Sequence, residues 1–190
     1  MVFFKDKILR KKLKGYWSII PSLQIHEIMG ISGFDFGIID LEHGTYSFQE
    51  ALESVIAIKR SNMHALIRPS SHDEKEILRC LELGVDGLCI PHIKTTEEAK
   101  SVLSFVKYPP QGIRGASGFT RATRYGADEF DVHVSKSNES IFISLLIESM
   151  EGLNNAKEIA MLDGVDNLYF GTYDIASSIG DKNQKSEKVK

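Results

Sequence analysis

Short apolar segments alternate with helices that carry N-terminal capping signals, and this alternation constrains the fold more than any other feature of the chain. Three segments match the Ser/Thr-x-x-Glu pattern of a helix capping box, and they begin at Ser47, Ser71 and Thr95. A short apolar run typical of a buried strand precedes each of them. Alternation of this kind predicts parallel strands joined by crossover helices, which is an α/β fold.

The alternation continues along most of the chain. A long loop from Tyr108 to Gly126 interrupts it, and loops of that length in a compact domain are commonly functional or mobile. The basic segment 5–14 is expected to form a helix or an arm. Strands are expected over 16–20, 36–40, 65–68, 87–90, 141–147 and 168–171, and helices over 23–31, 47–60, 71–83, 95–106 and 154–161, with a helical turn from 172 to 180.

The composition indicates a single globular domain. The chain has 190 residues, of which 42% are hydrophobic and 26% are charged, enough for one sizeable core. We expect one domain over residues 1–180 and a charged tail over 181–190. A net charge of −3 does not indicate binding to nucleic acid or to an acidic membrane.

Targeting and disulfide signals are missing from the sequence. No apolar run approaches the roughly 18 residues of a membrane span, and the N-terminus does not have the apolar core of a signal peptide. Cys80 and Cys89 lie in apolar stretches and are expected to be reduced core residues. These features predict a cytoplasmic protein with no membrane association.

Ionisable side chains stand at or just after the C-terminal ends of the expected strands. The stretch from Phe36 to Gly44 is the clearest case, because a buried apolar run changes abruptly into two acids and a histidine. The C-terminal ends of parallel strands meet at one face, where α/β folds place their chemistry. The side chains expected to converge there are those of Asp40, Glu42, His43, Arg68, His92, Glu148 and Asp174.

The residue types suggest specific roles. Glu148 and Asp174 suit a hard divalent cation, which prefers oxygen ligands. Arg68 can hold a carboxylate or a developing oxyanion, and His43, backed by one of the two acids before it, can move protons near neutral pH. Each of these residues also has a purely structural interpretation. The carboxylates could be helix caps or ion-pair partners, the arginine could form a structural salt bridge, and the histidine could be an ordinary loop residue. No lysine at a strand end indicates a Schiff base.

Taken together, these segments resemble the HpcH/HpaI aldolase family, the metal-dependent pyruvate aldolases grouped with citrate-lyase-like proteins. The resemblance runs from about residue 20 to residue 180. Its motifs, highly specific in this order and at this spacing, are Phe34–Gly44, Ile67–Pro69, Gly84–Pro91, Tyr108–Gly115, Ile147–Glu148, Gly164–Asp166 and Gly171–Asp174.

The resemblance implies a fold and a reaction. The fold would be a TIM-type (β/α)8 barrel, of which about six βα units are present here. The reaction would be the reversible, metal-dependent aldol cleavage of a 4-hydroxy-2-oxo acid, similar to 2,4-dihydroxyhept-2-enedioate, to pyruvate and an aldehyde. The metal would be Mg²⁺ or Mn²⁺, with Co²⁺ or Zn²⁺ left open. The enzyme would be a homo-oligomer with a small-molecule 2-oxo acid substrate.

The resemblance also implies roles for individual residues. The metal would be held by Glu148 and Asp174. Arg68 would steady the pyruvate enolate, and His43 would be the acid/base with Asp40 behind it. The residues expected to bind substrate are Gly171, Thr172 and Tyr173.

The chain departs from the family pattern in three ways. Leu146 stands where the family has Gln, two residues before the metal glutamate, and Tyr173 replaces a small residue beside the metal aspartate. The third departure is the number of expected strands, six where a closed barrel of this kind has eight. The two substitutions bear on the donor substrate more than on the metal.

Two alternatives stay open at this point. A related lyase that acts on an acyl thioester or a phosphoenolpyruvate-like substrate would be favoured by a basic groove made of Arg114, Arg121 and Arg124. A non-catalytic remnant that binds a metal or a partner would be favoured by Leu146, Tyr173 and the missing strands.

Overall fold

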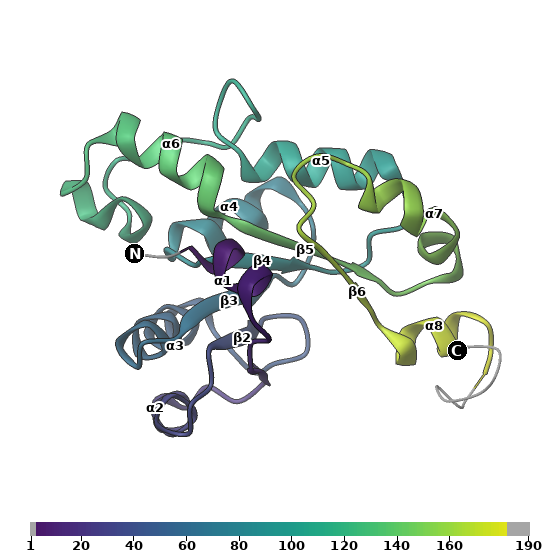
Figure 1. The fold of residues 1–190 in the computed structure, drawn as a ribbon, viewed down its shortest axis with the longest axis horizontal. Helices are drawn as coiled ribbons and strands as arrows, with labels where there is room; N and C mark the ends of the chain where they lie inside the picture. Colours follow the sequence, from purple (N-terminus) through teal and green to yellow (C-terminus); the bar gives the residue numbers. More distant parts are fainter. Residues whose placement is uncertain (1–2, 182–190) are drawn as a thin grey trace.

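The computed structural model describes residues 3–181, which form a curled sheet of six parallel strands (Figure 1). Each strand pairs with the next one in the sequence. The strands are β1 (Gly15–Ser18), β2 (Phe36–Asp40), β3 (His64–Arg68), β4 (Gly87–Ile90), β5 (Phe142–Ile147) and β6 (Asn167–Phe170). The observed strand ends differ from the expected ones by at most two residues.

Helices follow the strands as crossovers, which makes the chain a series of βα units. The helices are α1 (Phe4–Arg10), α2 (Leu23–Ile31), α3 (Phe48–Arg60), α4 (Glu74–Glu82), α5 (Thr96–Val106), α6 (Phe130–Ser140), α7 (Met150–Ala160) and α8 (Thr172–Ser178), with a 3-10 segment at Arg121–Gly126. Six parallel strands in sequential order with alternating helices are part of a TIM-type barrel. The predicted fold class is therefore confirmed.

Alternate residues of each strand face the two sides of the sheet, and both sides are apolar. One side packs against α3, α4, α5 and α7 through a core that includes Ile39, Ile67, Ile90 and Ile143. The other side forms a smaller core with Ile38, Leu66, Cys89, Phe142 and Leu146. Strands buried on both faces read as continuous apolar runs, which is why they could be located in the sequence.

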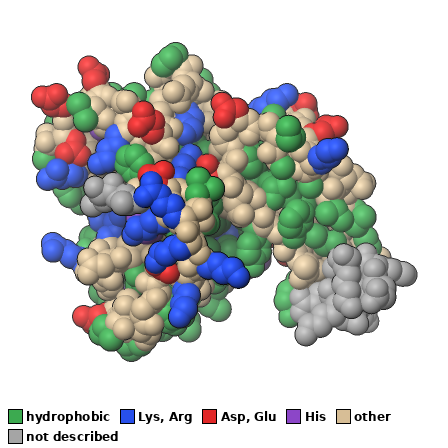
Figure 2. Space-filling model, viewed as in Figure 1, with side chains coloured by type: hydrophobic (Ala, Val, Ile, Leu, Met, Phe, Trp, Pro, Cys, Tyr) green, Lys and Arg blue, Asp and Glu red, His purple; other side chains and the backbone are tan. Residues whose placement is uncertain are grey.

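The basic N-terminal segment forms α1, which covers the N-terminal end of the curled sheet. Phe4 is buried, and its ring centroid lies 5.1 Å from that of Phe36 and 4.9 Å from that of Phe142, at the beginnings of β2 and β5. Lys5 pairs with Asp166 at 3.0 Å. Lys and Arg side chains gather near the centre of the face drawn in Figure 2, interspersed with acidic ones. The segment thus closes one end of the sheet.

Two of the three expected capping boxes form, and the third is wrong. Ser47 and Thr95 each accept a hydrogen bond from the backbone of the glutamate three residues on, and that glutamate binds back. At α4 the cap is Asp73, whose side chain accepts from the Glu76 N–H at 3.0 Å, while Ser71 donates to the Asp73 carboxylate. A carboxylate accepts more strongly than a hydroxyl, so the cap lies two residues later than expected and the helix begins at Glu74.

The segment expected to be a long loop contains structure of its own. The 3-10 segment lies within it, and α6, which follows it and precedes β5, was not anticipated. Arg114 is buried there, donates to Ser137 Oγ at 3.1 Å and has its guanidinium 4.3 Å from the Tyr108 ring centroid. Arg121 donates to the Leu83 carbonyl at 2.6 Å. These contacts order the loop.

Both cysteines are free and buried, as the sequence predicts. Burial raises the pKa of the Cys89 thiol to about 12.

α7 begins at Met150, four residues before the expected start, because Ser149 caps it by accepting from the Gly152 N–H at 3.1 Å.

Across residues 3–181, none of the helices combines the length and apolar character that crossing a membrane requires.

A buried histidine makes the stability of the fold depend on pH. His26 on α2 is fully buried, its Nδ1 lies 2.8 Å from the Tyr16 hydroxyl, and burial lowers its pKa to about 4. Because the pKa of His26 is lower in the folded state than in the unfolded state, the stabilisation that the neutral side chain contributes is intact above about pH 6.5 and is lost as the pH falls toward 4. Between pH 7 and pH 4 we expect the free energy of unfolding of His26→Gln to fall by about 2–3 kcal/mol less than that of the wild type. Urea unfolding across that range checks this, and identical pH profiles would contradict it.

Candidate active site

The strand-end residues converge at the C-terminal end of the sheet. The register of β2 and β3 places Asp40 beside Arg68. Glu148 follows β5 directly, and Asp174 lies in the first turn of α8. Asp40, Arg68 and Glu148 are all less than 9% exposed, which is uncommon for charged side chains unless they are paired.

Arg68 is the centre of an ion-pair network. Its Nε donates to Asp40 Oδ1 at 2.8 Å and its Nη2 donates to Oδ2 at 2.5 Å, the bidentate geometry that suits a guanidinium. Its Nη1 lies 2.9 Å from Glu42 Oε2 and 3.9 Å from Glu148 Oε1. The guanidinium carbon also lies 4.8 Å from the Trp17 ring centroid. Arg68 is therefore held in one orientation among three carboxylates.

Asp40 fixes both the arginine and the turn that follows β2. Its Oδ1 also accepts from the backbone N–H groups of Glu42 at 3.0 Å and His43 at 3.2 Å. Burial opposes ionisation, but the Arg68 hydrogen bonds and these backbone donors outweigh it and lower the pKa of Asp40. The carboxylate is thus a positioning group for this face.

His92 bridges two carboxylates from different strands. Its Nε2 lies 2.7 Å from Glu42 Oε1 and its Nδ1 lies 3.2 Å from Glu148 Oε2. Its backbone N–H also donates to Glu148 Oε2 at 2.8 Å. The backbone of His92 has φ +59°, which is uncommon for a residue other than glycine and turns the imidazole over the strand ends. Strain of this kind is concentrated at functional sites.

Glu148 has an environment that disfavours its own charge. Burial raises its pKa, and the charges of Glu42 and Asp174 raise it further, while the contacts with His92 act in the opposite direction. Gly171 leaves room for the side chain, because a Cβ there would lie 2.7 Å from Glu148 Cγ. A buried carboxylate beside other acids is the arrangement that a bound cation would relieve.

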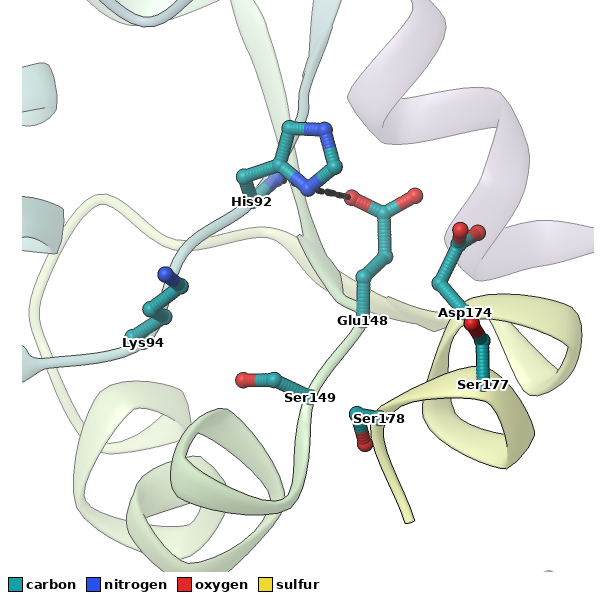
Figure 3. A pocket seen from close by; sticks show the side chains of 7 residues that line it. All are labelled: His92, Lys94, Glu148, Ser149, Asp174, Ser177 and Ser178. Carbon is teal, nitrogen blue, oxygen red and sulfur yellow. Dashed lines mark hydrogen bonds and ion pairs between the residues drawn. The ribbon is translucent and has the colours of Figure 1, made fainter. Parts of the chain in front are cut away.

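A cavity of about 280 Å³ opens beside these carboxylates (Figure 3). Glu148 and Asp174 extend from one side of it, His92 lies above Glu148, and Lys94 lies across from them. Within residues 3–181 there is no group of three His, Cys, Asp or Glu side chains arranged to hold a metal. Mg²⁺ is commonly bound by one or two carboxylates and several waters, so the pair fits a hard divalent cation.

The structure places the remaining predicted residues less centrally. His43 is exposed and its backbone N–H, not its ring, contacts Asp40, which corrects the expectation that Asp40 lies behind the imidazole. Tyr173 is 73% exposed and does not fill the cavity. Leu146 is 1% exposed and belongs to the smaller core, while its carbonyl accepts from the Ile93 N–H at 3.1 Å.

The basic groove does not form at this face. Arg121 binds the carbonyl of Leu83, which precedes β4 and so lies at the opposite end of the strands. Arg114 pairs with Glu82 at 3.3 Å, and Arg124 pairs with Asp128 at 3.0 Å. The feature that would have favoured the thioester or phosphoenolpyruvate-like substrate is therefore absent from the described strand ends.

Sequence reasoning left His92 open and did not identify Lys94. Both follow β4 in the segment Pro91-His92-Ile93-Lys94, so their position after a buried strand was the available signal. Lys94 lies four residues beyond the end of β4, so the expectation that no strand-end lysine indicates a Schiff base did not bear on it. Lys94 nonetheless lines the cavity.

A partial TIM-type barrel with an arginine and carboxylates at the C-terminal strand ends defines the class as an α/β-barrel enzyme. The chain matches the HpcH/HpaI aldolase/citrate lyase family over residues 14–189, and it belongs to that family. The predicted family is thereby confirmed, and with it the prediction that the protein is an enzyme of the aldolase and lyase type.

Relatives and solved structures agree with this assignment. The chain is 36% identical over 172 residues to hydroxypyruvate/pyruvate aldolase of Sagittula stellata, covering 90% of this chain and 67% of that protein. It is 33% identical over 180 residues to 5-keto-4-deoxy-D-glucarate aldolase of Escherichia coli, covering 93% and 69%. The HpcH/HpaI aldolase structure from Desulfitobacterium hafniense superposes with a TM-score of 0.90 at 28% identity, covering 100% of this chain and 74% of that one.

Proposed function

We propose that the protein is a divalent-metal-dependent aldolase that cleaves a 4-hydroxy-2-oxo acid to pyruvate and an aldehyde. The observation that carries the proposal is the cluster at the strand ends, where Asp40, Glu42 and Glu148 surround a single guanidinium and Asp174 lies nearby. Carboxylates outnumber cations there, which favours a bound cation. The aldolase names of the relatives point to the same chemistry.

Glu148 and Asp174 are the proposed metal ligands. Mg²⁺ or Mn²⁺ fits their hard oxygen atoms best, with Co²⁺ or Zn²⁺ as further candidates. When bound, the metal would act as a Lewis acid that stabilises the negative charge developing on the oxo acid. The backbone and side chains at Gly171, Thr172 and Tyr173, at the start of α8, are proposed to bind the acid itself.

Arg68 and His43 are the proposed catalytic residues. Cleavage breaks the C3–C4 bond: the 4-hydroxyl proton passes to a base, the aldehyde leaves, and the bonding electron pair becomes the pyruvate enolate, which is then protonated at C3. Arg68, held by Asp40, would steady the enolate oxygen, because a preorganised guanidinium needs little rearrangement in the transition state. His43, exposed beside this face, would carry the proton.

Titration calorimetry tests the proposed metal and donor sites together. Pyruvate, or oxalate as an enolate mimic, is expected to bind the purified protein with Mn²⁺ and not without it. Asp174→Ala is expected to weaken Mn²⁺ binding at least about tenfold, because one of two protein ligands is lost. Asp174 is exposed, so the variant is expected to fold.

The outcomes of the titration separate the alternatives. Metal binding without pyruvate binding would contradict the pyruvate donor and implicate Leu146 and Tyr173. Binding of neither would favour a non-catalytic remnant.

We also propose a homo-oligomer, in line with the exposed apolar side chains of Ile28 (58%) and Ile31 (83%) on α2. Sedimentation velocity of the purified protein checks the oligomer.

A further inference from the structure

His92 lines the cavity beside the proposed metal ligand Glu148 and contacts it through two of its own groups. Its backbone N–H donates to Glu148 Oε2 at 2.8 Å, and its ring Nδ1 lies 3.2 Å from the same oxygen. Figure 3 shows the other carboxylate oxygen directed away from the imidazole, to the side of Asp174. His92 thus engages one oxygen of Glu148 and leaves Oε1 on the side of the second proposed ligand.

The backbone of His92 places both of these groups. Its φ of +59° lies in the left-handed region, which a residue with a β-carbon keeps only where surrounding contacts hold it. The next residue supplies such a contact, because the Ile93 N–H donates to the Leu146 carbonyl at 3.1 Å. Leu146 belongs to β5, which Glu148 follows directly. The segment after β4 is therefore fastened to the strand that carries the metal carboxylate.

The second ring nitrogen faces a different carboxylate, which gives the histidine two conceivable roles. Its Nε2 lies 2.7 Å from Glu42 Oε1, and Glu42 Oε2 lies 2.9 Å from Arg68 Nη1. His92 could therefore position either Glu148 or, through Glu42, the arginine. Two observations favour Glu148. Its Oε2 receives the backbone N–H of His92 as well as the ring contact, and Glu42 already has a close partner in Arg68, which lies 3.9 Å from Glu148 Oε1.

We propose that His92 is a positioning residue for the metal site, which holds Glu148 Oε2 through ring Nδ1 and backbone N–H so that Oε1 is presented to the cation beside Asp174. This inference rests on the proposed function, because it requires a cation at Glu148 and Asp174. A carboxylate that is already held loses less side-chain freedom when the cation binds. Loss of such an outer contact commonly weakens metal binding about 10–100-fold.

Two amide substitutions separate the two ring contacts. The amide nitrogen of His92→Asn lies near the place of Nδ1, so this variant can keep the contact with Glu148 and loses that with Glu42. The amide nitrogen of His92→Gln lies near the place of Nε2, which reverses the two contacts. Both amides are neutral, so any loss of ring charge cancels from their comparison. We expect Mn²⁺ to bind His92→Gln about tenfold or more weakly than His92→Asn.

A third variant separates the ring from the backbone. Glycine adopts a φ of +59° without strain, so His92→Gly keeps the N–H donor to Glu148 and removes the imidazole. We expect it to bind Mn²⁺ as weakly as His92→Gln, to within about threefold. If it bound as tightly as His92→Asn, the backbone alone would hold Glu148 and the role of the ring would be overturned.

Electron paramagnetic resonance of the free Mn²⁺ ion measures these affinities without pyruvate and without turnover. The side chain of His92 is 50% exposed, so all three variants are expected to fold, and circular dichroism checks this. His72→Asn and His72→Gln are the matched controls, because His72 follows β3 at the same face but does not line the cavity. Both controls should bind Mn²⁺ within about twofold of the wild type.

The outcomes distinguish failure of this inference from failure of the proposed function. Equal affinities of His92→Asn and His92→Gln for Mn²⁺ would overturn the positioning of Glu148. Tighter binding by His92→Gln would also overturn it, by assigning the histidine to Glu42. In either case, binding by the wild type that Asp174→Ala weakens would leave the proposed metal site standing. A wild type that bound no Mn²⁺ would remove the metal site and this inference together.

Discussion

Glu148→Gln is expected to abolish enolate formation while leaving the fold intact. Losing a buried metal ligand removes several kcal/mol of charge stabilisation, so the exchange of pyruvate protons should fall at least about a thousandfold. The glutamine oxygen can still accept the His92 N–H that Glu148 accepts at 2.8 Å. Proton exchange by NMR and Mn²⁺ titration measure the two losses.

The same variant should be at least as stable as the wild type at neutral pH. Burial and the neighbouring acids raise the pKa of Glu148, which means that its ionised form costs folding energy above its ordinary pKa. A neutral amide avoids that cost. Glu151→Gln, an exposed position in the first turn of α7, serves as the control and should change neither property. A Glu148→Gln variant that still exchanged pyruvate protons would refute the metal assignment.

Arg68→Met is expected to lower the free energy of unfolding by about 3–5 kcal/mol at pH 7, because removing one partner leaves buried carboxylates unpaired. Arg68 pairs with Asp40 and Glu42, and both side chains are largely buried. Arg68→Lys should restore little of this loss, since an ammonium group cannot make the bidentate contact. Urea unfolding at pH 7 is the measurement.

The loss in Arg68→Met should shrink at low pH. The wild-type pair lowers the pKa of Asp40, so its stabilisation is present above the ordinary pKa near 4 and disappears as the pH falls through the lowered value. Arg124→Met is the control, because Arg124 and Asp128 form an exposed pair with side chains 73% and 30% exposed. That variant should cost less than about 1 kcal/mol. Equal losses in the two variants would show that the buried network adds nothing.

Local signals located most of the elements correctly. Strands buried on both faces appear as short apolar runs, and β2 and β4 were predicted with the observed ends. The capping boxes at Ser47 and Thr95 depend only on residues three apart, so they too could be read directly. Local signals failed where two neighbours compete for one role, as Ser71 and Asp73 do at α4.

The segment between the long loop and β5 shows a different limit of local patterns. α6 contains polar residues, few strong helix formers and no side-chain cap, so nothing in its own sequence indicates a helix. It is held by distant contacts, such as that between Asn138 and the backbone of Tyr108, whose N–H lies 2.8 Å from Asn138 Oδ1. Arg114 likewise takes its partners from α4 and α6.

The sequence by itself determined the alternation of strands and helices, the face on which the ionisable residues gather, and the family. The tertiary structure alone decided which of these residues touch: Asp40 binds Arg68 and not the His43 ring, His92 joins Glu42 to Glu148, and Lys94 faces the cavity. Strand ends follow from local patterns of burial. Side-chain partners follow from strand register and from backbone angles such as that of His92, which arise only when residues far apart in the chain pack together.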